Sequence, residues 1–271
     1  MFDISVLYKK IKKIKQQADK FQTNCYFDNY KLRNIAEKEN SSLLIGLNYI
    51  FLIYDEMNFA RLYYWISDIK DIIYIDNYLK NNVYPKDILL ELLGTEESIR
   101  EKKQHFLNVG FNSYSILSRY RAKFLKIKPV NNTDITYHVL EKEAVEYVPE
   151  LLLSNLDPYE SHLPTLDYLY ELQKQKLLYG AYDNNKLIGI LCLEKIGENG
   201  IYIYQISIMK YYQGKGIGTD IENFAFTKYP ESNNFTTWIN DNNLISQKMN
   251  IGLGYKKDGL KTEVLIYRKN V

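Results

Sequence analysis

The chain has 271 residues, 46% of them hydrophobic and 25% charged, which suits a soluble globular protein with two modest domains or one extended domain. The net charge of +2 does not indicate nucleic-acid binding, although residues 1–130 hold a small excess of Lys and Arg that is a weak argument for RNA. Cys25 and Cys192 form no C-x-x-C motif, so we expect no disulfide framework. No apolar run reaches the ~20 residues of a spanning helix, so we expect no membrane span. Since no signal peptide is recognisable, we expect a cytoplasmic protein.

The first half of the chain alternates helical and strand patterns. We expect helices over residues 3–20, 28–39, 71–79 and 96–108, and strands over residues 43–54, 59–66 and 88–93. The first helix is amphipathic and basic; it could lie on a membrane, but packing on its own domain is the more common outcome. Thr95 is expected to cap the helix over 96–108, Gly110 to end it, and Phe111 to open another strand pair.

A linker is predicted at residues 126–133, which contain Pro129 and Asn131-Asn132. We therefore divide the chain into domains at residues 1–128 and 133–271. In the second domain we expect strands over 135–140, 177–182, 186–194, 201–208, 235–239 and 262–269, and helices over 143–153, 165–176, 217–226 and 243–253. Residues 155–164 form a polar loop.

A glycine-rich turn at residues 213–219, reading Gln-Gly-Lys-Gly-Ile-Gly-Thr, joins the strand over 201–208 to the helix that follows. Glycines allow a ligand to approach the backbone, and the free N–H groups at a helix start attract anions, with Lys215 adding a positive charge. A tight turn that needs glycine only for its geometry is the alternative, but three alternate glycines between a strand and a helix favour phosphate. The pattern fits neither G-x-x-x-x-G-K-[ST] nor G-x-G-x-x-G.

This stretch resembles the acyl-CoA signature [Q/R]-x-x-G-x-[G/A] of the GNAT acetyltransferase superfamily, which is met here by Gln213, Gly216 and Gly218. The resemblance implies that Ile206, Ser207 and Ile208 lie along the pantetheine arm of acetyl-CoA. It also implies that backbone amides hold the pyrophosphate, and these would come from Gly214, Lys215, Gly216, Ile217, Gly218 and Thr219.

A second family pattern, N-x-x-[A/S]-x-x-x-Y-x-x-x-G-[F/Y], is matched by Asn243, Ser246, Gly254 and Tyr255. The match implies that Asn243 belongs to the cofactor site. Asn250 stands at the position of the family's tyrosine, which commonly protonates the departing thiolate. The proton donor therefore stays open between Tyr255, a tyrosine of the central strand, water, and a domain that is catalytically weak.

The resemblance implies an α/β fold with a mixed sheet, GNAT-like in the C-terminal half. The N-terminal half is either a degenerate GNAT-like repeat or an unrelated accessory α/β domain. The repeat is suggested because Gly110-Phe111 answers to Gly254-Tyr255, and the same spacing sets residues 88–93 against 232–237. The glycine turn has no counterpart in the first half, since residues 69–71 read Ile-Lys-Asp.

The function implied is N-acetyl transfer from acetyl-CoA to a primary amine of a small molecule or peptide; the alternative is a non-catalytic acyl-CoA-binding or partner-binding module. Four residues could serve as the base, and none is assigned because each has an ordinary structural role as an alternative: Glu194, Tyr202, Tyr204 and Asp241. The three histidines form no i, i+4 pair, so no metal is expected, and His162 lies in the loop that by resemblance lines the acceptor site. No nucleic-acid partner is expected, and the oligomeric state stays open.

Overall fold

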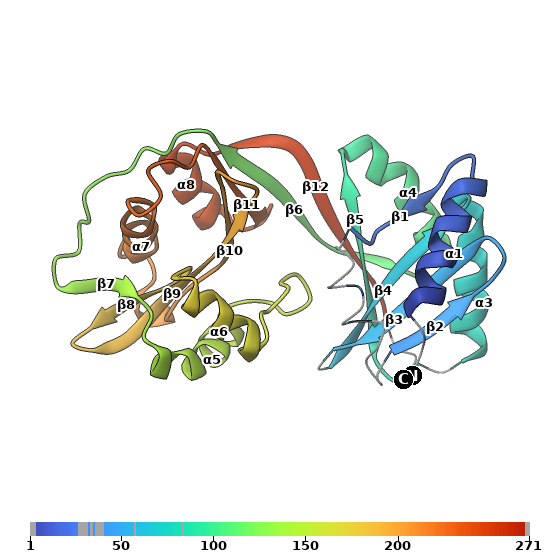
Figure 1. The fold of residues 1–271 in the computed structure, drawn as a ribbon, viewed down its shortest axis with the longest axis horizontal. Coiled ribbons are helices and arrows are strands. Elements are labelled where there is room, and N and C mark those ends of the chain that lie inside the picture. The colour runs from blue at the N-terminus through green and yellow to red at the C-terminus, as the bar shows by residue number, and fades with distance from the viewer. Residues whose placement is uncertain are drawn as a thin grey trace. The chain divides into compact units, whose positions relative to one another are not determined.

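The computed structural model describes residues 4–26, 32, 35, 41–56, 58–82 and 84–268 (Figure 1). These residues form two compact units, one comprising Met1–Ile116 with Leu260–Val271 and the other Leu117–Gly259. Each unit contains strands of a mixed sheet together with helices, which confirms the predicted fold class. No helix in the described part of the chain is long and apolar enough to span a membrane.

The N-terminal unit is built on the strand order β2-β3-β4-β5-β12, in which β12 is Lys256–Tyr267. Its elements are α1 (Ile4–Gln17), β1 (Gln22–Thr23), β2 (Ser41–Ile45), β3 (Tyr49–Asp55), β4 (Phe59–Ile66), the 3-10 helix η1 (Ile69–Ile72), α3 (Ile73–Asn81), β5 (Asp87–Gly94) and α4 (Glu96–Asn108). The apolar face of α1 buries Ile4, Leu7 and Ile14 in a cluster with Trp65, because these side chains recur at helical spacing.

Two sequence expectations for this unit are wrong in detail. The run predicted as one strand over residues 43–54 is two strands, since the chain turns between them and the Gly46 amide donates to the Tyr49 carbonyl at 3.0 Å. The strand pair expected from Phe111 is a single strand, β6 (Asn112–Ala122), because no turn interrupts it. The helix predicted over 28–39 lies outside the described residues except for Leu32 and Ile35, which are buried.

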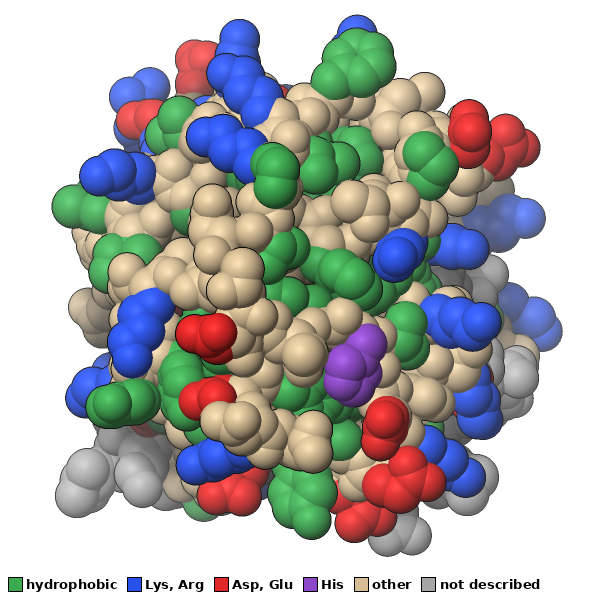
Figure 2. All heavy atoms as spheres, turned by 90° about the vertical axis from the view of Figure 1, so that its left-hand side faces the viewer, with side chains coloured by type: hydrophobic (Ala, Val, Ile, Leu, Met, Phe, Trp, Pro, Cys, Tyr) green, Lys and Arg blue, Asp and Glu red, His purple; other side chains and the backbone are tan. Residues whose placement is uncertain are grey.

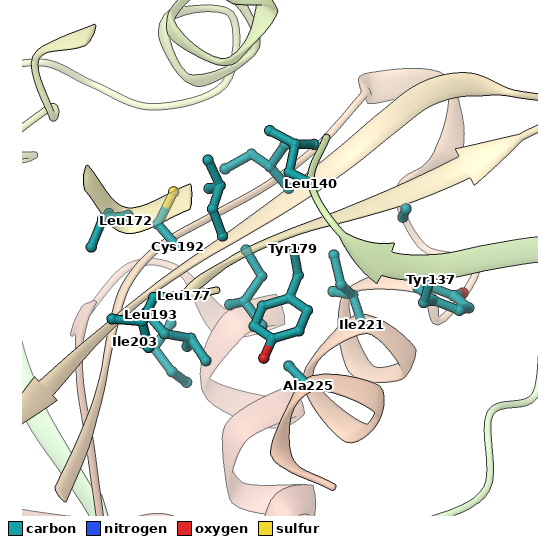
Figure 3. Packing of buried hydrophobic residues seen from close by; sticks show 14 of the residues in the cluster. Tyr137, Leu140, Leu172, Leu177, Tyr179, Cys192, Leu193, Ile203, Ile221 and Ala225 are labelled. Carbon is teal, nitrogen blue, oxygen red and sulfur yellow. The ribbon is translucent and has the colours of Figure 1, made fainter. Parts of the chain in front are cut away.

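The C-terminal unit is built on the strand order β6-β11-β10-β9-β8-β7. Its elements are β7 (Ile135–Val139), η2 (Lys142–Tyr147), α5 (Val148–Leu153), α6 (Leu166–Lys174), β8 (Leu178–Asp183), β9 (Lys186–Ile196), β10 (Gly200–Ile208), η3 (Lys210–Tyr212), α7 (Ile217–Phe226), β11 (Asn234–Asn240) and α8 (Leu244–Leu253). Figure 3 shows the Tyr179 ring directed from the sheet towards Ala225 of α7, whereas Leu172 of α6 lies on the opposite side of the strands. The central strands are therefore covered on both faces.

The strand that links the units, β6, completes the C-terminal sheet, whereas the N-terminal unit takes its last strand from the far end of the chain. β6 pairs antiparallel with β11, from Phe235↔Ala122 to Asn240↔Leu117. β12 (Lys256–Tyr267) pairs antiparallel with β5, from Lys261↔Gly94 to Tyr267↔Ile88. Residues 123–134 have no helix or strand, as expected of a linker, but they lie inside the C-terminal unit, because the chain has already joined that sheet through β6. The domain limits at residues 128 and 133 stay a prediction.

Charges are mixed on the face of the molecule that Figure 2 turns towards the viewer. Basic and acidic side chains alternate there with apolar ones, and neither sign forms a continuous field. This face therefore offers no large patch of one sign that would steer a highly charged partner.

Candidate functional site

Strands β10 and β11 begin side by side and then part. They are in parallel register only from Gly200↔Asn234 to Tyr202↔Thr236. On its other edge, β10 stays paired with β9 as far as Ile208↔Gly189, with a bulge between Ile203 and Gln205. Beyond Tyr202, one edge of β10 is thus no longer in register with a neighbouring strand, and an extended ligand with amide groups could add there as a further strand.

The hydrogen bonds between β10 and β9 show which backbone N–H and C=O groups of β10 face this unpaired edge. The Met209 amide donates to the Ile188 carbonyl of β9 at 2.8 Å. Because backbone groups alternate between the two edges of an antiparallel strand, Ser207 also faces β9, whereas Ile206 and Ile208 face the edge that β11 has left. The Ile208 carbonyl accepts a hydrogen bond from Gln213 Nε2 at 2.8 Å, in agreement with this orientation.

The glycine turn connects β10 to the start of α7 and requires glycine for two different reasons. Gly214 and Gly216 have φ values of 75° and 85°, in the left-handed region that side chains disfavour. Gly218 instead avoids crowding, because a Cβ at this position would lie 3.3 Å from Met249 Sδ. The alternate glycines of the sequence are therefore explained by backbone conformation at the first two and by packing at the third.

The helix start leaves its amides available. Gly216 is the N-cap of α7 and makes no side-chain cap hydrogen bond, and the first backbone bond of the helix runs from Asp220 N to Gly216 O at 3.0 Å. Within the described part of the chain, the amides of residues 214–219 donate to no protein acceptor. Lys215 Nζ lies 4.2 Å from the centre of the Tyr211 ring, so a positive charge stands at the same turn. Unpaired donors, the helix dipole and a lysine together favour an anion.

Buried polar contacts hold this turn in place from below. The Asp220 carboxylate is fully buried and accepts hydrogen bonds from the backbone amides of Asn131 and Asn132 at 3.1 and 3.0 Å. Asn132 Nδ2 also donates to the Lys215 carbonyl at 3.1 Å. The segment predicted as a linker therefore supports the glycine turn, a role that the sequence did not indicate.

A side-chain network ties the end of β10 to the loop after α5. Gln213 Nε2 donates to Asn155 Oδ1 at 3.0 Å, and Asn155 Nδ2 donates to Ser207 Oγ at 3.0 Å. The buried Ser207 hydroxyl in turn donates to the Leu151 carbonyl at 3.0 Å. The side chains of Gln213 and Ser207, both expected at the cofactor site, thus position this loop through Asn155. In the sequence, only the place of Asn155 in a polar loop could have indicated this role.

The second family pattern lies on α8. Asn243 is the N-cap of this helix, and its Oδ1 accepts from the Ser246 amide at 3.0 Å. Asn250 is buried and donates to the Ser246 carbonyl at 2.9 Å. Tyr255 is also buried, and this burial, with a smaller contribution from nearby Glu222, raises the pKa of its hydroxyl well above 10. Tyr255 is therefore poorly suited to replace the missing tyrosine as a proton donor.

The base candidates are separated by their partners. Asp241 Oδ1 accepts hydrogen bonds from Ser118 Oγ and Lys257 Nζ, both at 2.7 Å, so its charge is already compensated. Tyr204 donates its hydroxyl to the His162 carbonyl, and burial raises the pKa of this hydroxyl far above neutral pH, which keeps it protonated. These contacts give both residues a structural role.

Glu194 lies opposite Tyr202 in the β9–β10 ladder and is half-buried. Its Oε1 accepts from the Tyr168 hydroxyl of α6 at 2.7 Å, and the Tyr168 ring lies 6.0 Å from the Tyr204 ring in an edge-to-face arrangement. Its observed partner is thus a hydroxyl, which orients a carboxylate without neutralising it. The described residues contain no cluster of three His, Cys, Asp or Glu side chains that could hold a metal ion.

Comparisons with known proteins agree with this geometry. Residues 144–255 match the model of the acetyltransferase (GNAT) family. A comparison with curated protein sequences gave no match. The fold is similar to that of a tandem GNAT protein from the clavulanic acid biosynthesis pathway, with a TM-score of 0.62 and 9% identity over 99% of this chain and 95% of the other.

Two further solved structures have the same fold. An acetyltransferase of the GNAT family from Colwellia psychrerythraea gives a TM-score of 0.58 with 12% identity over 99% of this chain and 98% of the other. A GCN5-related N-acetyltransferase from Kribbella flavida gives 0.58 with 11% identity over 88% and 92%. Because these likenesses cover nearly the whole chain, the GNAT-like fold extends to the N-terminal unit, in agreement with the first of the two alternatives that the sequence left open. Residues 144–255 therefore form a domain that matches the acetyltransferase (GNAT) family.

Proposed function

We propose that the C-terminal unit is an N-acetyltransferase that transfers an acetyl group from acetyl-CoA to a primary amine of a small molecule or peptide. The observation that carries the proposal is the set of unpaired amides at residues 214–219, placed where β10 ends and α7 begins. A diphosphate fits these donors, and the edge of β10 at Ile206 and Ile208 fits the amides of a pantetheine arm.

The acceptor would enter on the face of the sheet that carries α5 and α6. Tyr168 of α6 and Glu194 of β9 meet there, next to Tyr202 where β10 and β11 part. Amine acylation requires a group that takes a proton from the ammonium before the nitrogen attacks the thioester. Glu194 is our candidate for that group, because its partner is a hydroxyl, whereas Asp241 already binds a lysine.

A non-catalytic acyl-CoA-binding module is the rival function. It is favoured by one observation: the position of the family's tyrosine is held by Asn250, which is buried and cannot donate a proton usefully. A thiol of ordinary acidity needs little help to leave near neutral pH, since its pKa is about 8.5 by analogy with cysteine. Water can therefore replace the tyrosine, and the loss of this residue does not exclude catalysis.

Isothermal titration with acetyl-CoA, followed by thiol release with a panel of amines, tests the proposal. Binding with turnover of at least one amine supports an N-acetyltransferase. Binding without turnover across a broad panel supports the module, and no binding at millimolar acetyl-CoA would refute both.

A further inference from the structure

The N-terminal unit repeats the parting of two parallel strands. β4 and β5 are in parallel register only from Phe59↔Asp87 to Arg61↔Leu89, and β5 then continues beside β12. On its other edge β4 stays paired with β3 as far as Ile66. The edge of β4 beyond Arg61 thus corresponds to the edge of β10 beyond Tyr202.

In this unit the chain itself covers that edge. β1 pairs antiparallel with the end of β4, with Gln22 opposite Ile66 and Thr23 opposite Trp65. The short strand therefore lies along β4 at the place where β5 has left it, and it belongs to the same compact unit.

The next residue extends the cover with its side chain. Asn24 Oδ1 accepts from the Tyr64 amide at 2.8 Å, and Asn24 Nδ2 donates to the Leu62 carbonyl at 2.8 Å. Thr23 Oγ1 donates to the Tyr64 carbonyl at 2.6 Å. Asn24 and Tyr64 are both buried, so these bonds replace contacts that a ligand would otherwise make.

The helix start that follows β4 is closed as well. The Asp68 side chain accepts from the Lys70 amide at 2.9 Å, and the Asp71 carboxylate accepts from the Asp68 amide at 3.1 Å. This reciprocal capping box uses backbone donors that the uncapped Gly216 leaves free in the C-terminal unit. It also places two carboxylates at the helix start, where they would repel a diphosphate.

We propose that residues 22–24 are a permanent internal substitute for the pantetheine arm, so that the N-terminal unit keeps the acyltransferase fold but has no coenzyme A site. This inference rests on the proposed function of the C-terminal unit. The chain then binds one coenzyme A, and the N-terminal unit has a sheet edge that is complete without a ligand.

The stoichiometry of coenzyme A binding to the full chain is the first test. Wild-type protein is expected to bind one molecule per chain, and G216D is expected to bind none. Two sites in the wild type, of which one remains in G216D, would overturn the inference while leaving the proposed function intact. No binding to the wild type would instead overturn the proposed function.

Amide hydrogen exchange tests the internal occupant without depending on the C-terminal site. The Tyr64 amide is expected to be protected in the free protein and unaffected by coenzyme A. In N24A it should exchange at least about tenfold faster, because its acceptor is lost, whereas N24D keeps Oδ1 and should retain most of the protection. Fast exchange at Tyr64 in the free wild-type protein, or equal rates in N24A and the wild type, would contradict the inference.

Discussion

Replacement of Gly216 by aspartate is expected to abolish coenzyme A binding while the fold persists. A Cβ at this position meets nothing closer than Asn132 Nδ2 at 3.6 Å, so the new side chain fits. Only the backbone conformation is unfavourable, since φ is 85° and a non-glycine residue in the left-handed region costs roughly 1–2 kcal/mol. Aspartate and asparagine tolerate this region better than other residues, so the cost should lie at the lower end.

The effect on binding is larger than the effect on folding. A carboxylate about 4–6 Å from a phosphate charge costs roughly 3–4 kcal/mol at an effective dielectric constant of about 20. Each 1.4 kcal/mol corresponds to about a factor of ten in Kd, so the charge alone should weaken binding by roughly 100-fold or more.

The matched control is G216N, which has the same shape and nearly the same backbone cost but no charge. Isothermal titration with coenzyme A should show G216D at least about 100-fold weaker than G216N. Thermal denaturation should show both variants melting within a few degrees of the wild type. Equal affinities for G216D and G216N would refute the electrostatic argument, and wild-type affinity in both would show that these amides do not hold phosphate.

Three further predictions concern other residues of the C-terminal unit. N155A should raise the KM for acetyl-CoA by roughly tenfold, since it removes the acceptor of Gln213 Nε2. N155D keeps that oxygen and should have a smaller effect. Equal KM values for N155A and the wild type in initial-rate assays would contradict the role of Asn155 in positioning Gln213. E194Q should lower kcat by roughly 100-fold without changing the Kd for coenzyme A, because general-base catalysis contributes about that much. E198Q, in the exposed turn after β9, is the control. Unchanged thiol release in E194Q would exclude Glu194 as the base. Burial raises the pKa of Glu222 from its ordinary value of 4.5 to about 8, so between these pH values the folded protein retains a proton that the unfolded chain has lost. The free energy of unfolding should therefore fall as pH rises from about 4.5 to about 8 and level off above that range. By linkage, E222Q should remove this slope and stabilise the protein by about 3 kcal/mol at pH 7. Denaturant titrations at several pH values test this, and parallel pH profiles for E222Q and the wild type would disprove the assignment.

Local features were predictable from the sequence because they depend on atoms a few residues apart. Thr95 and Thr165 cap their helices through hydrogen bonds to Ser98 and Tyr168, three residues further on. The turn at residues 213–219 needs glycine for its own backbone angles, so its place between a strand and a helix could be predicted before any contact was known.

Only the tertiary structure decided which residues far apart in the sequence lie along the same strand edge or form an ion pair. Asn24 and Tyr64 are 40 residues apart, and Asn155 and Gln213 are 58 apart, so neither pair leaves a periodic signal in the sequence. Asp241 was one of four base candidates in the sequence, and only the fold showed that Lys257 lies beside it. The same holds for the edges of β10 and β4. The residue pattern of the sequence predicts that each strand exists, but the neighbour of a strand is set by which backbone edges meet when the whole chain packs. That packing decides whether a strand edge is left for a ligand or covered by the protein.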